Sequence, residues 1–218
     1  GYRRITSGGA AKGLNIPSGY HSTMKTSADS RVVYLPAYGI AWQNYQGDEY
    51  NIVGQYDVTI ELPHVPYFGT YEFRIGMQNV ADRRGMCQLY FGTNPNNLEA
   101  IGLPLDMRIY GENPQIEWEE DTDDEDYNTE IEKRMRIHGY MKAPKYFGTA
   151  STTAVSGNFR NNNRVFRRIA YTGTFDPQKT YYLRMKSVLE NTSTQLFLDY
   201  FEWCPKSVYN GVEEEDDW

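Results

Sequence analysis

Aromatic and amide side chains are concentrated between residues 34 and 50, where the chain reads YLPAYGIAWQNYQGDEY. Aromatic rings stack on the C–H faces of sugars, and neighbouring amide or carboxylate groups orient the sugar through hydrogen bonds. Gly and Pro mark the segment as a loop between strands, where recognition residues are concentrated. A glycan contact is therefore expected here, and the alternative is that the rings cap the end of the core. The predicted contact residues are Tyr38, Trp42, Asn44, Tyr45 and Asp48.

A second group of candidate ligand contacts is the pair Arg83 and Arg84, in the turn ADRRG. A guanidinium presents several donors to hydroxyl or carboxylate oxygens, so this pair could assist binding. Catalysis has less support, because no G-x-S-x-G, H-E-x-x-H or glycine-rich phosphate motif is present. A glycosidase needs two carboxylates at a defined separation, and the sequence singles out no pair. We expect a non-enzymatic protein, with a jelly-roll glycoside hydrolase as an alternative.

Four acids reproduce part of the spacing of a calcium-binding loop. Positions 1, 3, 5 and 12 of an EF-hand loop would be Asp121, Asp123, Glu125 and Glu132, but Asp126 stands where that loop requires glycine. Looser calcium binding is one hypothesis, and no other cofactor is expected. The alternative is a hydrated, mobile acidic loop, because eight carboxylates within residues 117–126 repel one another.

Charge is unevenly distributed along the chain. The net charge is −7, but 13 of the 29 acids lie in two short segments: eight in residues 117–126 and five in residues 213–217. The rest of the chain therefore has 16 acids and all 22 bases, so it carries a net positive charge. Nucleic-acid binding needs a concentrated basic face, and the densest basic segment, NFRNNNRVFRR, is expected to be a solvated loop that leads into a strand. We therefore expect no nucleic-acid partner. The arginines of this segment are Arg160, Arg164, Arg167 and Arg168.

The two cysteines, Cys87 and Cys204, both fall in strand-like segments. They could form a disulfide in an exported protein if their strands meet, or they could be small buried hydrophobic residues. We favour free thiols. No apolar run approaches the roughly 18–20 residues that a membrane-spanning helix requires.

Alternating segments predict a β fold. Apolar residues occupy every second position in residues 56–62 and 70–78, as in strands with one face on a core. Pro63, Pro66 and Gly69 separate these two segments, which predicts an antiparallel hairpin. About eight or nine such strands with few helices between them favour an all-β jelly-roll sandwich over a Rossmann or TIM-barrel fold.

One helix is expected over residues 126–139, where acids come first, bases follow and Gly139 ends the segment. It lies in a long, polar, loop-rich insertion at residues 111–163. The expected organisation is an extended lead-in at 1–30, one jelly-roll domain at 31–211 that includes the insertion, and an acidic tail at 212–218.

Four stretches together carry a resemblance to a known group of proteins. They are GTYEFRIGMQNVADRRGMCQLYFG (69–92), GLPLD (102–106), HGYMKAP (138–144) and LDYFEWCPKSVYNG (198–211). This combination resembles the C-terminal, galactose-binding-like jelly-roll domain of Bacteroides-type fasciclin-domain surface lipoproteins. The fasciclin motifs themselves are not found, so any fasciclin domain or lipid-anchored leader would lie outside this chain.

The resemblance implies a module of the cell surface, anchored to the outer membrane, or of the periplasm, in a glycan-foraging or adhesive setting. On this basis we expect a monomeric, non-catalytic module that binds glycan or another extracellular ligand and meets a membrane only through an anchor outside the chain. The principal alternative is a structural or adhesive domain that contacts surface proteins.

Overall fold

The computed structural model describes residues 22–26, 31–35, 49–144, 159–188 and 194–208, and in this part of the chain two six-stranded antiparallel sheets pack together. Sheet A has the order β1-β4-β11-β6-β7, with β8 paired to β6, and sheet B has the order β2-β3-β12-β5-β10-β9. The strands of sheet A are β1 (Ser22–Thr26), β4 (Tyr56–Glu61), β6 (Met86–Gly92), β7 (Glu99–Ala100), β8 (Leu105–Asp106) and β11 (Tyr182–Ser187). Those of sheet B are β2 (Arg31–Leu35), β3 (Glu49–Val53), β5 (Gly69–Gln78), β9 (Tyr140–Lys142), β10 (Val165–Phe175) and β12 (Gln195–Pro205). The predicted β-sandwich is confirmed.

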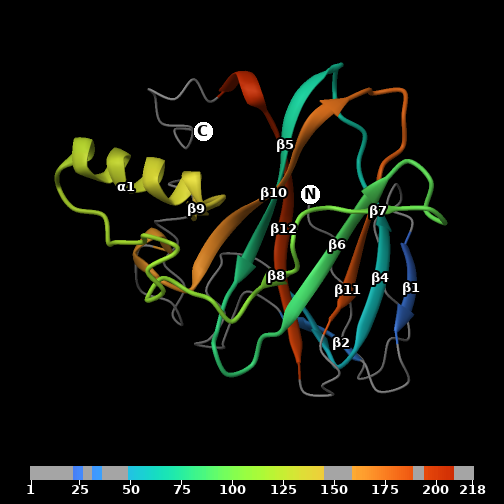
Figure 1. Cartoon of the computed structure of the whole chain (residues 1–218), viewed down its shortest axis with the longest axis horizontal. Helices are drawn as coiled ribbons and strands as arrows, with labels where there is room; N and C mark the ends of the chain where they lie inside the picture. The colour runs from blue at the N-terminus through green and yellow to red at the C-terminus, as the bar shows by residue number, and fades with distance from the viewer. Residues whose placement is uncertain (1–21, 27–30, 36–48, 145–158, 189–193, 209–218) are drawn as a thin grey trace.

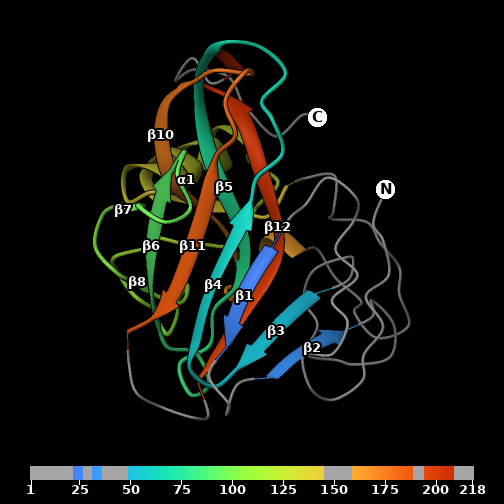
Figure 2. The same ribbon diagram turned by 90° about the vertical axis from the view of Figure 1, so that its right-hand side faces the viewer.

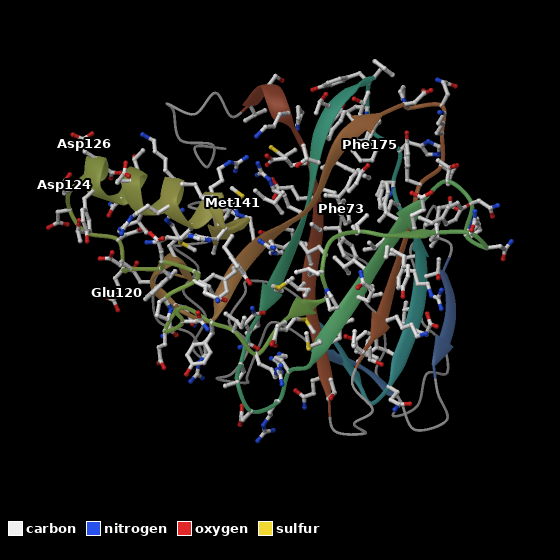
Figure 3. The ribbon with its side chains drawn as sticks, in the orientation of Figure 1. Phe73, Glu120, Asp124, Asp126, Met141 and Phe175 are labelled. Atoms are coloured by element: carbon white, nitrogen blue, oxygen red, sulfur yellow. The ribbon has the colours of Figure 1, made fainter. Side chains whose placement is uncertain are left out.

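The main core lies between the two sheets. On β5 every second side chain points inward, as the sequence pattern predicts, and these four side chains are at most 1% exposed: Tyr71, Phe73, Ile75 and Met77. The Phe73 ring centroid lies 4.8 Å from that of Trp203, and the Phe175 centroid lies 4.6 Å from the same ring. Figure 3 shows Phe73 and Phe175 in this interior.

The predicted hairpin of residues 56–62 and 70–78 is wrong. β4 pairs with β1 and β11 in sheet A, whereas β5 pairs with β10 and β12 in sheet B. The Pro- and Gly-rich segment between them therefore crosses from one sheet to the other. Figure 1 shows β4 and β5 in separate layers. Part of the predicted lead-in also differs from expectation, because Ser22–Thr26 forms β1.

The described part of the insertion, residues 111–144 and 159–163, packs on the sandwich through its own small core. Helix α1 (Glu125–Ile137) confirms the predicted helix, and the Asp124 side chain caps it by accepting a hydrogen bond from the Tyr127 N–H. β9 follows α1 and joins sheet B beside β10, and the 3-10 helix η2 (Phe159–Asn161) comes later in the chain. Figure 1 shows α1 on the side of sheet B that faces away from sheet A. The buried residues of this second cluster are Ile116, Ile131, Met135, Tyr140 and Phe166.

Candidate functional site

No helix in the described part of the chain covers the outer face of sheet A. Figure 2 shows β1, β4, β11 and β6 toward the viewer, with α1 behind the sandwich. Burial alternates along β4, β6 and β11, so one set of side chains enters the core and the other set faces outward. The outward set, which we call the sheet A platform, consists of Asp57, Thr59, Glu61, Gln88, Tyr90, Tyr182, Arg184 and Lys186.

Arg184 is the centre of the sheet A platform. Its backbone is paired with Tyr90 on β6 and with Thr59 on β4. The guanidinium donates two hydrogen bonds to the Asp57 carboxylate, of 2.6 Å from Nε and 2.5 Å from Nη2, and its Cζ lies 5.2 Å from the Tyr90 ring centroid. The hydrogen bonds that Arg184 donates to Asp57 raise the pKa of Arg184, so the group stays charged and is held in one orientation.

A second tyrosine lies one row away on the same face. Tyr182 is paired with Glu61 on β4, and its offset from Tyr90 makes the two rings diagonal neighbours, whose Cα atoms are roughly 7–8 Å apart in an antiparallel sheet. Burial and the negative charge of Glu61 raise the pKa of the Tyr182 hydroxyl. This hydroxyl therefore remains protonated at neutral pH and can act as donor and acceptor.

The sheet A platform can recognise polyhydroxylated ligands. Two partly exposed rings offer apolar faces, while Arg184 and Lys186 supply donors and the carboxylates of Asp57 and Glu61 supply acceptors. Two acids and two bases lie on the platform, so its formal charge is zero. Sugar hydroxyls, which donate and accept at once, match this mixture.

The residues predicted from the 34–50 segment, Tyr38, Trp42, Asn44, Tyr45 and Asp48, lie outside the described residues. Of the predicted arginine pair, Arg83 is exposed and lies 3.7 Å from the Asp82 carboxylate. Arg84 is 6% exposed and donates to the backbone oxygen and Oε1 of Gln78 and to Oε1 of Gln195. The structure thus leaves Arg83 open to a ligand and gives Arg84 a role in joining β5 to the start of β12.

The four predicted calcium ligands occupy different environments. Asp121 accepts hydrogen bonds from Lys142 at 2.5 Å and from Arg160 at 2.7 Å, and Arg160 also pairs with Glu132. Burial tends to raise the pKa of Asp121, but the contacts with Arg160 and Lys142 outweigh it and lower that pKa. These two cations occupy the carboxylates that a calcium ion would need.

Asp123 and Glu125 lie in the exposed part of the acidic run, at the start of α1. In Figure 3 the neighbouring Asp124 and Asp126 lie at the end of α1 that is far from the sandwich. No group of three or more His, Cys, Asp or Glu side chains that could hold a metal ion occurs in the described ranges. Calcium binding by this run remains a prediction without a preformed site.

A partly buried group of charges on the outer face of sheet B was not predicted. We call it the sheet B charge cluster, and it comprises Glu72, Arg74, Arg136, Arg167, Glu202 and Lys206. The expectation of a solvated basic segment at 160–168 is wrong for Arg160 and Arg167, which are 3% and 2% exposed. Alternation along β5 places Glu72 and Arg74 on its outer face, but it gives no sign that other parts of the chain cover this face.

Glu72 is the carboxylate on which three cations of the sheet B charge cluster meet. Arg74 Nη2 lies 2.8 Å away, Arg136 Nη2 2.6 Å and Lys206 Nζ 2.8 Å. Burial would raise the pKa of Glu72, but the hydrogen bond from Lys206 and the charges of Arg136 and Arg74 lower it to about 2. The second carboxylate, Glu202, lies 3.2 Å from Arg74 Nη1 and 3.9 Å from Arg167 Nη1.

The two cysteines are buried free thiols, as we favoured from the sequence. Cys87 is on β6 of sheet A and Cys204 on β12 of sheet B. Burial raises the pKa of the Cys87 thiol to about 12, which keeps it protonated and unreactive at neutral pH.

The chain matches no protein-family model and no curated protein sequence. A membrane-spanning helix is likewise not found, since no helix in the described part of the chain is both long and apolar enough.

Proposed function

We propose that the protein is a non-catalytic module that binds neutral glycan chains through the sheet A platform. The observation that carries this proposal is the Arg184 guanidinium, which is fixed by Asp57 and stacked near Tyr90 on a sheet face without a described helix over it. A fixed donor beside an aromatic ring provides both the orienting and the stacking contact that a sugar requires. The aromatic segment at 38–48, which lies outside the described residues, remains a second predicted contact.

We further propose a jelly-roll topology and a cell-surface or periplasmic setting. The orders β3-β12-β5-β10 in one sheet and β4-β11-β6 in the other support a jelly roll, because strands from the two halves of the chain alternate along these parts of the sheets. The surface setting, with a lipid anchor outside this chain, follows from the resemblance to fasciclin-type lipoprotein domains. It agrees with a glycan ligand, which such a module would meet outside the cell.

Carboxylate spacing supports a binding role over hydrolysis. Asp57 and Glu61 are the acids of the sheet A platform. They are four positions apart on β4, which places their Cα atoms roughly 13 Å apart. Glycosidases hold their two carboxyl groups about 5–9.5 Å apart. Asp57 is also bound by Arg184, which favours its charged form and makes it a poor proton donor.

Glycan-array binding by matched arginine variants tests the proposal. Arg184→Ala and Tyr90→Ala should each lower binding at least tenfold, since each removes one central contact. Arg108→Ala is the control: Arg108 makes the same two-point contact with Asp106, at 2.8 and 2.6 Å, and Asp106 is paired with Met86, four positions along β6 from Tyr90. Equal binding by the Arg184 and Arg108 variants, or no retention of any glycan, would contradict the proposal. Release of reducing sugar from a polysaccharide panel would instead support the hydrolase.

An adhesive protein–protein module is the second candidate function. Tyr67 and Phe68, in the crossing between β4 and β5, are 56% and 70% exposed, which is unusual for rings of this size. Two adjacent exposed rings are suited to contact with another protein. Loss of envelope-protein capture in Phe68→Ser, with glycan binding unchanged, would favour this candidate.

A further inference from the structure

The charge imbalance of the chain is concentrated in the segment 117–137, which leads into α1 and includes it. This segment holds ten acids and three bases, so its formal charge at neutral pH is −7. The rest of the chain keeps 19 of the 29 acids and 19 of the 22 bases, which cancel. We call residues 117–137 the acidic arm. With all ten carboxyl groups protonated, the acidic arm would carry a charge of +3.

One attachment of the acidic arm lies near the end of α1. Arg136 Nη2 donates two hydrogen bonds of 2.6 Å to the Glu72 carboxylate on β5. The same carboxylate lies 2.8 Å from Arg74 Nη2 and 2.8 Å from Lys206 Nζ, which begins the 3-10 helix η3 (Lys206–Val208). This attachment therefore depends on one carboxylate that stays ionised among three cations.

A second attachment lies before α1. Asp121 accepts hydrogen bonds of 2.5 Å from Lys142 Nζ on β9 and of 2.7 Å from Arg160 Nε on η2. Arg160 also pairs with Glu132, one helical turn before Arg136 on α1. Lys142 and Arg160 are almost completely buried, so these pairs lie within the contact and not in open solvent. The second attachment requires ionised carboxyl groups as well.

Apolar contact between the acidic arm and the sandwich is limited to a small cluster. The buried apolar residues of the arm are Ile131 and Met135, which pack with Ile116, Tyr140 and Phe166. Among the described residues, the main core between the sheets includes none from the arm. A helix of 13 residues is marginal in water by itself, so α1 depends on its attachments for stability.

Acid removes both attachments. Burial would raise the pKa values of Glu72 and Asp121, but the cations around them lower both, that of Glu72 to about 2. A carboxyl group with a lowered pKa stabilises the folded state above its ordinary pKa, and this stabilisation is lost as the pH falls toward the lowered value. Acid thus breaks the contacts and sets a positive arm against the cations with which it was paired.

Charged groups face these two carboxylates from every element packed around them. Those around Glu72 are Arg74, Arg136 and Lys206, with Glu202 beside Arg74 and Arg167 beside Glu202; those around Asp121 are Lys142 and Arg160, with Glu132 on Arg160 and Glu119 and Glu120 near Lys142. The acids among them lose their charge in acid, whereas the cations keep theirs.

We propose that the acidic arm is an acid-released cover for the outer face of sheet B. In acid it detaches and unfolds as one unit, while the two sheets keep their own core. Its release uncovers Phe166 of β10 and Tyr140 of β9, which pack with Ile131 and Met135 at neutral pH. The arm lies on the side of sheet B that faces away from sheet A (Figure 1), so this inference does not depend on glycan binding by the sheet A platform.

Hydrogen exchange of the full chain between pH 7 and pH 2.5, followed by mass spectrometry, tests the release. Protection factors, which correct for the pH dependence of intrinsic exchange, are compared for α1 and for β11 of sheet A. We expect α1 to lose its protection at a pH at which β11 is still protected at least a hundredfold. Loss of both at the same pH, or an α1 that stays protected down to pH 2.5, overturns the proposal.

Two charge-matched variants on α1 give an independent test at pH 7. Arg136→Gln removes the contact with Glu72 and should lower the protection of α1 at least tenfold, because a buried carboxylate loses one partner. Lys133→Gln removes the same charge from the same helix, but Lys133 makes no ion pair with the described residues, so protection should stay within twofold of wild type. Asp121→Asn removes the second attachment and should act as Arg136→Gln does. Equal protection in the Arg136 and Lys133 variants overturns the proposal.

Discussion

Glu72 and Arg74 stand two residues apart on the outward side of β5 and are joined by hydrogen bonds of 3.1 Å from Nε and 2.8 Å from Nη2, with both side chains almost completely buried. An outward pair on a sheet is ordinarily solvated. Here α1 approaches it, and Arg136 of that helix binds the same carboxylate. The pair therefore connects the helical insertion to the sandwich.

Acid should destabilise the protein through Glu72. Its pKa in the folded state, about 2, lies below the ordinary value of 4.5, so the folded state binds the proton less tightly than the unfolded chain. The stabilisation is complete above about pH 4.5 and is lost as the pH falls toward 2; the difference corresponds to about 3 kcal/mol. NMR titration of the Glu72 carboxyl and unfolding midpoints from pH 7 to 2 measure both effects. Titration of Glu72 near pH 4 would contradict the prediction.

Removal of the Glu72 charge should cost far more than removal of an exposed one. Glu72→Gln leaves Arg74, Arg136 and Lys206 without their shared carboxylate, and breaking a buried pair in this way costs about 3–5 kcal/mol. Asp106→Asn, the control, breaks the partly exposed pair with Arg108 and should cost less than about 1 kcal/mol. Urea denaturation compares the two variants, and equal costs would argue against a structural role for the cluster.

The native thiols should resist alkylation. Cys87 has a pKa of about 12 and Cys204 is 7% exposed, so iodoacetamide at pH 8 should modify neither within hours. Both should react rapidly in denaturant, where burial is lost. Mass spectrometry counts the adducts. Rapid modification of the folded protein would show that one of the two strands opens locally.

Gly76→Ala should destabilise the protein by about 1–3 kcal/mol. A Cβ atom at this position would come within 2.4 Å of the Tyr200 ring, on the neighbouring strand β12. Gly69→Ala on the same strand is the control, because a Cβ atom there would lie 3.7 Å from the Tyr71 ring, an ordinary van der Waals distance. Thermal unfolding measures both, and similar melting temperatures for the two variants would show that Tyr200 moves aside freely.

Alternation and helix-end charges made the local structure predictable. Inward positions of β5, such as Phe73, follow from a period of two, and α1 follows from acids at its start and bases near its end. The pairing of strands was less predictable. A Pro- and Gly-rich connection is compatible with both a hairpin and a crossing between sheets. The strand that actually lies beside β4 is β11, and its Arg184 is 127 residues away from the Asp57 that it contacts.

The candidate sites were only partly predictable for the same reason. The centre of the sheet A platform combines side chains from three strands: Tyr90, Arg184 and Asp57. No local sequence motif predicts that these three residues lie in contact. The alternating segments that hold them could have pointed to an outward row on each strand. The outward side chains of β5 are buried because α1 packs near them, and Arg136 of α1 is 64 residues away from Glu72 in the sequence. No short-range sequence pattern predicts this burial.

The irregularity of pairing between Ile169 and Tyr171 has a consequence for solubility. In the described part of the sheet, β9 covers β10 along Phe166–Arg168, and the later residues of β10 form a lateral edge. Bulges twist such an edge away from the flat geometry that another chain would need to add a strand. The bulge thus discourages self-assembly along this edge of the described sheet.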